Sequence, residues 1–326
     1  MQRPNEDLEA LGIGAPFVDY IIEVSNEQLV QLAGSKGGMV AVDYPTLLNI
    51  IEEAGGNRSS VFFGGSGANT IKGLAHLGCR CGLIGRIGTD TAGKNFLEQM
   101  ESLGVKSFLR HTETPTGQVV CLITPDQERT MRSFFGASQE MSEKDLDPAV
   151  FEGVRLVHIE GYSLLKGSLV QRAMAVAKEA GARVSFDLGS FELVHAYKPL
   201  IIDLIKYVDI LFANRDEVYA LTQLDPQKGC DVLKDLCEIA VVLTGPEGCW
   251  IGRHDRRMHH PAFRVEAIDS TGAGDLFASG FLYGFLQGRS LDECAYYGSL
   301  TGAAAVQVRG AEIPDERWNE IKKLLK

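Results

Sequence analysis

The chain has 326 residues, of which 45% are hydrophobic and 23% are charged, so it can bury a large core and is neither disordered nor fibrous. Its 43 acidic residues exceed its 32 basic residues, and this negative charge would repel a phosphate backbone, which argues against a nucleic acid partner. Residues 1–9 lack the pattern of a secretory signal, the uncharged run 294–308 is too short to span a membrane, and the seven scattered cysteines are typical of reduced thiols, so we expect a cytoplasmic protein with no membrane segment.

Helical patterns that end at a glycine alternate with short apolar runs along most of the chain. The clearest helices are expected over 68–77, 96–103 and 169–180, each followed by a glycine suited to the position after a helix. Strands are expected over 81–85, 156–159, 183–186, 208–212 and 239–243. This alternation predicts a three-layer α/β/α fold, Rossmann-like, in which one domain over 1–326 is built on a mostly parallel sheet.

Two parts of the chain depart from this alternation, because strand-like runs follow one another there without intervening helices. These runs lie at about 17–24, 59–64 and 106–135, and turn residues separate them. We expect them to form a small antiparallel β lid on the main sheet. The lid is also the surface through which we expect two copies of the chain to associate, should a homodimer form.

Polar residues stand at the ends of four predicted strands. They are Glu160, Asp187, Asn214 and Thr244 with Gly245. The carboxyl ends of parallel strands meet at one edge of a sheet, where ligands of such folds bind. A single residue of this kind could equally be a helix cap, but four together favour a binding site.

The strongest local signal is a glycine-rich loop that opens an apolar helix, Asp269 to Asp275. The backbone N–H groups of Gly272, Ala273 and Gly274 would point outward at the positive end of the helix, where they could bind a phosphate. An acid beside such a site suits a base that takes a proton from an alcohol during phosphoryl transfer. The alternative is a glycine-rich helix start in which Asp275 is only a first-turn acid.

A second glycine-rich loop, Gly64 to Asn69, also precedes a helical pattern. Its glycines would allow the backbone to approach a polyol, and the Asn69 amide offers a donor and an acceptor to hydroxyls. Residues 88–95 are a near match to a P-loop, but Asn95 replaces the Ser or Thr that would bind magnesium. We therefore interpret Asp90 or Thr91 as a helix cap and Lys94 as a solvated side chain.

Taken in order, these segments resemble the ribokinase-like (PfkB) family of carbohydrate and nucleoside kinases. The resemblance extends over nearly the whole chain and is carried by Gly14–Asp19, Gly64–Asn69, Gly85–Gly93, Thr114–Gly117, Asn214–Glu217, Thr244–Gly248 and Asp269–Asp275. It implies ATP-dependent phosphorylation of a hydroxymethyl group on a small molecule.

The same resemblance implies a role for each matching residue. Asp275 would be the catalytic base, and Gly272, Ala273 and Gly274 would form the anion hole. The residues implied at the nucleotide and its Mg²⁺ are Asn214, Glu217 (which would hold Mg²⁺ through water), Thr244, Gly245 and Gly248. Those implied at the acceptor are Asp19, Gly64, Gly65, Asn69 and Glu160. Asp269 matches a site that binds a monovalent cation such as K⁺ in some members.

The acceptor is less clearly indicated. Thr114–Gly117 and Arg129–Arg132 look more like adenosine kinases, whereas Glu160 matches a sugar-contacting glutamate of ribokinase-like members. We expect a neutral ribose-bearing acceptor, with an adenosine-like nucleoside ahead of free sugars and its base stacked on Phe17, Phe134 or Phe135. The alternative is a ribokinase- or fructokinase-type sugar kinase. A non-catalytic binding protein on the same fold would be expected to lack Asp275 or the glycines before it.

Overall fold

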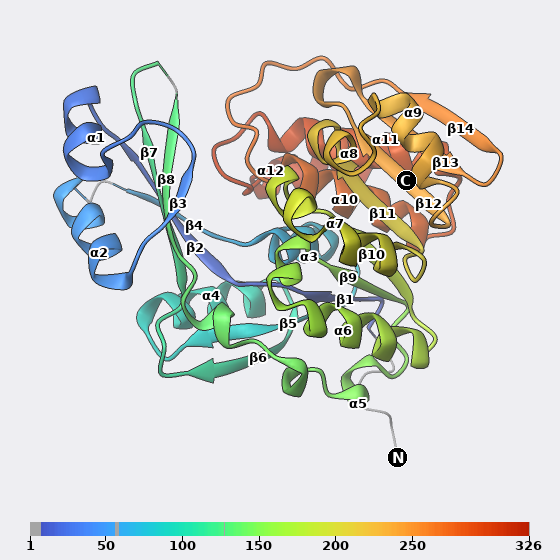
Figure 1. Ribbon diagram of the computed structural model, residues 1–326, viewed down its shortest axis with the longest axis horizontal. Helices are drawn as coiled ribbons and strands as arrows, with labels where there is room; N and C mark the ends of the chain where they lie inside the picture. The colour runs from blue at the N-terminus through green and yellow to red at the C-terminus, as the bar shows by residue number, and fades with distance from the viewer. Residues whose placement is uncertain (1–7, 56–58, 127, 326) are drawn as a thin grey trace.

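The computed structural model describes residues 8–55, 59–126 and 128–325. Nine strands of this part of the chain form a large sheet (Figure 1). Across the sheet they are β14 (Arg256–His260), β13 (Cys249–Arg253), β12 (Ile239–Leu243), β11 (Ile210–Asn214), β10 (Arg183–Asp187), β9 (Leu156–Ile159), β1 (Ala10–Ile13), β5 (Cys81–Gly88) and β6 (Lys106–Thr112). In this order across the sheet, all neighbouring strands between β12 and β6 are parallel. The hairpin β13–β14 adds two antiparallel strands at the β12 edge.

Helices cover both faces of the large sheet because both faces of each central strand are apolar. In β11, Leu211 and Ala213 pack against one layer of helices, whereas Ile210 and Phe212 pack against the other. The first layer contains α5 (Pro148–Phe151), α6 (Gly167–Glu179), α7 (Phe191–Ile205), α8 (Arg215–Thr222) and α9 (Pro226–Leu233). The second contains α3 (Ser66–His76), α4 (Thr91–Ser102), α10 (Ala273–Leu286) and α11 (Leu291–Ala305), with α12 (Asp315–Leu324) packed outside α10 and α11. The three-layer α/β/α expectation is confirmed.

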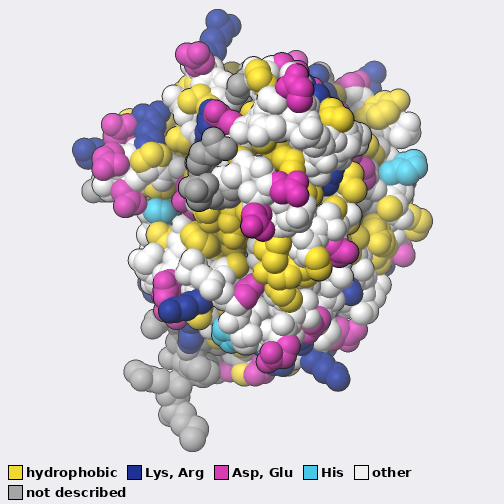
Figure 2. All heavy atoms as spheres, turned by 90° about the vertical axis from the view of Figure 1, so that its left-hand side faces the viewer, with side chains coloured by type: hydrophobic (Ala, Val, Ile, Leu, Met, Phe, Trp, Pro, Cys, Tyr) yellow, Lys and Arg dark blue, Asp and Glu magenta, His cyan; other side chains and the backbone are white. Residues whose placement is uncertain are grey.

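A second, smaller sheet lies to one side of the large one, on the left of Figure 1. Its order is β3 (Met39–Ala41), β8 (Arg129–Phe134), β7 (Gly117–Ile123), β2 (Phe17–Glu23) and β4 (Ser60–Gly64). Helices α1 (Asn26–Ala33) and α2 (Tyr44–Glu53) pack on one face through a cluster that includes Leu29, Leu47 and Ile50. Figure 2 looks onto this side of the molecule, where hydrophobic side chains lie between acidic and basic ones.

The boundaries of the predicted lid were partly wrong. The strand over 106–112, which we placed in the lid, is β6 and pairs in parallel with β5 at the edge of the large sheet. The small sheet also contains two parallel pairs, β2 with β7 and β3 with β8, so it is mixed rather than antiparallel throughout. The turn residues around Pro115 mark correctly where a strand ends, but they carry no information about which sheet each strand joins.

The local features at the helix ends are confirmed. Helices α3, α4 and α6 are followed by Gly78, Gly104 and Gly181, all with positive φ, the conformation that makes glycine favourable there. All seven cysteines are free thiols. Within the described ranges, no helix combines the length and the apolar character needed to cross a membrane.

Candidate active site

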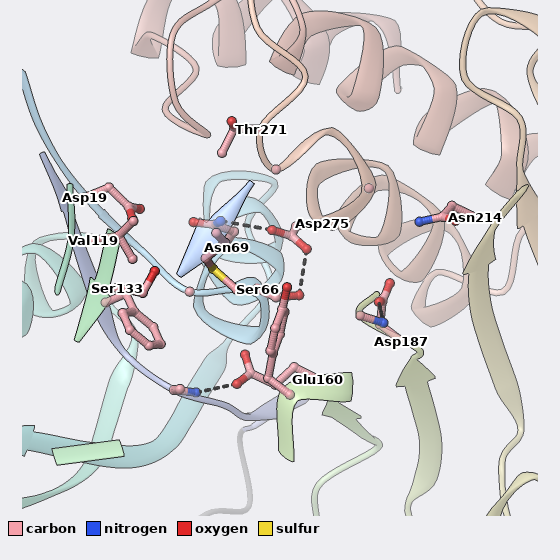
Figure 3. Close-up of a pocket in the computed structure, with 18 of the residues that line it drawn as sticks. Asp19, Ser66, Asn69, Val119, Ser133, Glu160, Asp187, Asn214, Thr271 and Asp275 are labelled. Carbon is pink, nitrogen blue, oxygen red and sulfur yellow. Dashed lines mark hydrogen bonds between the residues drawn. The ribbon is translucent and has the colours of Figure 1, made fainter. Parts of the chain in front are cut away.

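A pocket of about 360 Å³ lies where the two sheets meet, at the carboxyl ends of the parallel strands (Figure 3). The small sheet contributes Phe17 and Asp19, and the large sheet contributes the strand-end residues Glu160, Asp187 and Asn214. The starts of α3 and α10, with the loops before them, contribute a further group of lining residues: Gly65, Ser66, Asn69, Thr271, Gly272, Gly274 and Asp275. The strand ends and the two glycine-rich loops therefore converge on one cavity.

Asp275 lies in the middle of this pocket, in the first turn of α10. The Ser66 hydroxyl donates a hydrogen bond to its Oδ1 over 2.7 Å, and the Asn69 amide nitrogen donates to its Oδ2 over 3.0 Å. Burial raises the pKa of Asp275, and these two hydrogen bonds act in the opposite direction. The carboxylate is thus held in one orientation by two donors and can accept a proton from a ligand in the pocket.

The loop before α10 places backbone amides beside Asp275. Gly272 caps the helix in the left-handed conformation, with φ of 69°, and a Cβ atom there would lie 2.5 Å from the Cβ of Ala311. A Cβ atom at Gly274 would meet only Leu243, at 3.7 Å, so glycine at this position keeps the pocket open rather than relieving a clash. The Ala273 amide donates to the Ser270 carbonyl over 3.2 Å, which leaves Gly272 and Gly274 as the better candidates for binding an anion.

Asp19 on β2 forms the polar wall at the small sheet. Burial raises its pKa to about 6, and the nearby positive charge of Lys72 lowers it. A Cβ atom at Gly64 would lie 2.6 Å from Asp19 Oδ2, and one at Gly65 would lie 2.0 Å from the Ala15 carbonyl oxygen. These two glycines therefore permit the close approach between β2 and the start of α3 that brings Asp19 towards Asn69.

Lys72 is a buried charged residue behind this wall that was not among the site residues predicted from the sequence. Its ammonium group donates to the Phe63 carbonyl and lies 3.4 Å from Glu312 Oε1, which also accepts a hydrogen bond from the Gln99 side chain. Burial lowers the pKa of Lys72, whereas the charge of Glu312 raises it. Lys72 follows Asn69 by three residues, so the two share a face of α3, and this spacing is the signal that could have identified it.

Glu160 holds the backbone that leads from the large sheet into the small one. Its carboxylate accepts hydrogen bonds from the amides of Ala15 and Gly67, each over 2.7 Å. Burial raises its pKa to about 7. Glu160 lines the pocket, as expected, but both of its oxygens already bind the main chain, so a direct contact with the acceptor remains a prediction.

The residues that we expect at the nucleotide begin with Asn214, which lies on the side of Asp275 opposite to Asp19 (Figure 3). The Asn214 and Glu217 side chains form a reciprocal cap at the start of α8, with Asn214 Nδ2 donating to Glu217 Oε1 over 2.6 Å. A second pocket, also of about 360 Å³, shares Asn214 with the first and is lined by Thr244 and Gly245. Gly248 closes the turn behind this pocket, where its carbonyl accepts hydrogen bonds from the amide and hydroxyl of Thr244.

Three carboxyl groups, those of Asp187, Glu217 and Asp275, share this end of the first pocket. Burial raises the pKa of each, and the charge of Asp275 adds to the rise at Asp187 and Glu217. A divalent cation would favour their ionised forms, so the donor set fits Mg²⁺. Both Glu217 oxygens are hydrogen-bonded to Asn214, and no three His, Cys, Asp or Glu side chains of the described residues form a direct metal cage, so contact through water is the better fit.

Asp269, expected at a monovalent cation, has other partners. Its carboxylate accepts hydrogen bonds from the amides of Thr271 (2.7 Å) and Gly310 (2.9 Å) and forms an ion pair with Arg129 of the small sheet. The Asp269 carboxylate oxygens, which a cation would need as ligands, are thus bonded to N–H donors and a guanidinium. The residues around Asp269 therefore do not fit K⁺.

The expected aromatic contacts are divided between two faces of the small sheet. Phe17 and Phe135 line the pocket and meet edge to face with their ring centres 5.9 Å apart. Phe134 lies elsewhere, against Tyr44 at 5.0 Å, so its proposed stacking on the ligand was wrong. Alternate residues of a strand point to opposite sides of the sheet, which explains why a strand residue and its neighbour do not both reach the pocket.

The segment that imitates a P-loop is a capped helix start. The Asp90 carboxylate accepts a hydrogen bond from the Gly93 amide and caps α4, as predicted. It also binds the amide and hydroxyl of Thr116, which ties the start of α4 to the turn before β7. The Lys94 side chain is 74% exposed and pairs with Glu98, so the segment offers no phosphate site.

Comparison with known proteins gives concordant results. Residues 52–318 match the family model described as pfkB family carbohydrate kinase. The chain is 26% identical to a nucleoside kinase from Methanocaldococcus jannaschii, over 81% of this chain and 85% of that protein, and 27% identical to a ribokinase from Haemophilus influenzae, over 79% and 85%. The structure is similar to that of adenosine kinase from Sinorhizobium meliloti, with a TM-score of 0.88 and 28% identity over 98% of this chain and 99% of that one.

Proposed function

Because the chain belongs to the pfkB family of carbohydrate kinases, we propose that it transfers the terminal phosphoryl group of ATP to the hydroxymethyl group of a ribose-bearing nucleoside such as adenosine. Membership makes the chain a sugar or nucleoside kinase, and such kinases use ATP, generally with Mg²⁺. The observation that carries the proposal is the position of Asp275. Figure 3 shows it between Asp19 and Asn214, which in this proposal stand at the acceptor and at the nucleotide respectively.

In the proposed reaction, Asp275 accepts the proton of the acceptor hydroxyl. The hydroxyl oxygen bonds to the terminal phosphorus as the bond from that phosphorus to the bridging oxygen of ADP breaks. Ser66 and Asn69 hold the carboxylate in place by donating to its two oxygens. The amides of Gly272 and Gly274 bind the charge that gathers on the transferred group.

The nucleotide side positions the phosphates. Thr244 and Gly245 line the second pocket, where the nucleoside part of ATP would lie, and Asn214 joins the two pockets. When bound, Mg²⁺ neutralises charge on the phosphates and in this way assists departure of ADP. Glu217 and Asp187 would hold its water ligands.

A nucleoside acceptor is supported by extra space beside the ribose site. A further cavity of about 290 Å³ adjoins the first pocket and shares Phe17, Phe135 and Tyr162 with it. Its lining combines these rings with the apolar Leu165 and with polar side chains such as Ser138 and Gln139, a surface on which a flat heterocyclic base can stack and form hydrogen bonds. A free pentose or hexose would fill the space near Asp19 and Asn69 and leave this cavity unused.

We propose that the small sheet acts as a lid over this acceptor site. Four of its residues line the pocket: Phe17, Asp19, Val119 and Ser133. The last three are labelled in Figure 3. Its closure would exclude water that otherwise hydrolyses ATP.

The test is a comparison of acceptors at the same ATP and Mg²⁺ concentrations. Adenosine, other nucleosides, ribose and fructose are each incubated with the protein, ADP release is followed, and the product is identified by mass spectrometry. We expect adenosine to have the highest kcat/KM and to yield the 5′-monophosphate. Turnover of ribose or fructose without adenosine would disprove the nucleoside proposal and leave a sugar kinase. Acceptor binding without ADP release would indicate a binding protein on the same fold.

One variant distinguishes recognition of the nucleoside base from recognition of the sugar. Phe135→Ala removes one ring of the edge-to-face pair, and we expect kcat/KM for the nucleoside to fall by about tenfold while activity on any sugar changes little. An equal loss on both acceptors would assign Phe135 to the lid core instead.

A further inference from the structure

We infer that Arg129 provides, from within the chain, the positive charge that some relatives take from a monovalent cation, so that this kinase works without one. Arg129 is the first residue of β8 in the small sheet. Its guanidinium reaches across to the loop before α10, where one nitrogen pairs with Asp269 and another contacts the Thr271 hydroxyl. The inference rests on the kinase activity, and its test also includes a measurement that does not depend on that activity.

The carboxylate that a metal cation would need is already occupied by other partners. The Asp269 side chain is only 1% exposed, and each of its oxygens accepts a backbone N–H, from Thr271 and from Gly310. The Val306 carbonyl opposite accepts hydrogen bonds from the amides of Ile268 and Asp269. A metal ion would have to displace Arg129 from the same carboxylate against the repulsion of two positive charges.

The position of Arg129 relates this charge to phosphoryl transfer. Asp269 and Thr271 lead directly into Gly272, which caps α10 and lines the pocket. By holding Asp269 and Thr271, Arg129 fixes the loop that presents the anion-binding amides. We therefore assign Arg129 as a positioning residue, which acts through the loop and not by touching the acceptor.

The contact also joins the two sheets. Gly310, whose amide binds Asp269, and its neighbour Arg309 both contact the small sheet. A Cβ atom added at Gly310 would lie only 3.0 Å from the Phe62 ring, and Arg309 pairs with Glu23 over 2.7 Å. The charge that stabilises the loop therefore belongs to the small sheet.

The first experiment uses the unmodified protein. Its initial rate is measured with saturating acceptor, ATP and Mg²⁺ while KCl replaces choline chloride at constant ionic strength, up to about 100 mM, so that screening does not change. We expect the rate to vary by less than about twofold, because the charge is already in place. Activation by K⁺ of more than about fivefold would overturn the inference.

The second experiment asks whether Arg129 supplies the charge. We expect Arg129→Ala in choline chloride to lose about tenfold or more in turnover, and to regain activity when guanidinium or K⁺ is added at millimolar concentration. Arg309→Met is the control, because it removes another arginine of the same region whose carboxylate partner lies on the surface, and it should show no rescue. A folded Arg129→Ala variant with unchanged turnover would also overturn the inference.

Thermal unfolding provides the readout that needs no turnover. We expect K⁺, compared with choline, to leave the Tm of the unmodified protein unchanged and to raise that of Arg129→Ala, since only a ligand of the folded state stabilises it. An increase in the unmodified protein would reveal a cation site and disprove the inference. If no acceptor is ever phosphorylated, the proposed acceptor fails, and this measurement still decides whether a cation binds.

Discussion

Replacing Asp275 by asparagine removes the proton acceptor of the proposed reaction and keeps the size of the side chain. The structure indicates how the variant would adapt. The new amide must face a donor, because Ser66 and Asn69 both donate to the carboxylate. Asn69 Oδ1 is buried and has no hydrogen-bond partner among the described residues, so a flip of the Asn69 amide would let it accept from the new amide. We therefore expect Asp275→Asn to fold.

The loss of activity should be large. A positioned general base contributes about 10²-fold or more to turnover, and asparagine cannot take the proton, so we expect kcat to fall by at least that factor. In the proposed complex the acceptor and ATP would contact many other residues of the two pockets, and we expect their KM values to change little. The assay is ADP release under saturating conditions, with Lys94→Ala as a surface control that should keep full activity.

The thermal stability of Asp275→Asn should not fall together with its activity. Burial raises the pKa of Asp275, which means that the folded state disfavours its charged form, and this penalty is present at pH values above that raised pKa. A neutral amide removes the penalty, so we expect the Tm of Asp275→Asn at neutral pH to equal or exceed that of the unmodified protein. Turnover within threefold or so of the unmodified rate in the folded variant would refute the role of Asp275 as the base.

Further predictions concern the anion-binding loop, the acceptor wall and the small sheet. Gly274→Val should fold, because a Cβ atom at this position approaches only Leu243, yet lower kcat by about tenfold or more by covering the amides; unchanged kcat would remove these amides from the mechanism. Protonation of Asp19, whose pKa is about 6, should raise the acceptor KM as the pH falls through that value. Lys72→Met should shift this rise to higher pH and Glu312→Gln to lower pH, and identical KM profiles would contradict the coupling. If copies associate through the edge strand β3, where Val40 is 46% exposed, Val40→Lys should favour the monomer in light scattering, and an unchanged mass would exclude this interface.

The sequence was sufficient for features that depend on neighbouring residues. Strands β9 and β12 have the predicted boundaries, and the glycines after α3, α4 and α6 mark their ends correctly. The strand-end residues Glu160, Asp187 and Asn214 meet in one pocket, because the geometry of a parallel sheet requires it. The interpretation of Asp90 as a cap followed from the chemistry of its side chain alone.

Features that depend on long-range pairing could not be predicted in the same way. Nothing near 106–112 indicates that this strand joins β5 and not β7, because strand order is decided by the packing of the whole chain. The ion pair between Arg129 and Asp269 joins residues 140 positions apart, and no local pattern relates them. Glu160 was expected at the acceptor, but its hydrogen bonds to Ala15 and Gly67 arise only once three segments have come together.

The chain passes between the two sheets four times within the described residues: from β1 to β2, from β4 to α3, from β6 to β7, and from β8 towards Gly136. Because four connections and not one join the small sheet to the large one, the small sheet cannot move relative to the large sheet without affecting each of them. Any opening of the small sheet must therefore change backbone torsions at all four passages together. A proline that stiffens one of these connections should consequently slow the movement of the whole small sheet, and substitutions on its inner face can alter acceptor choice without changing the connections.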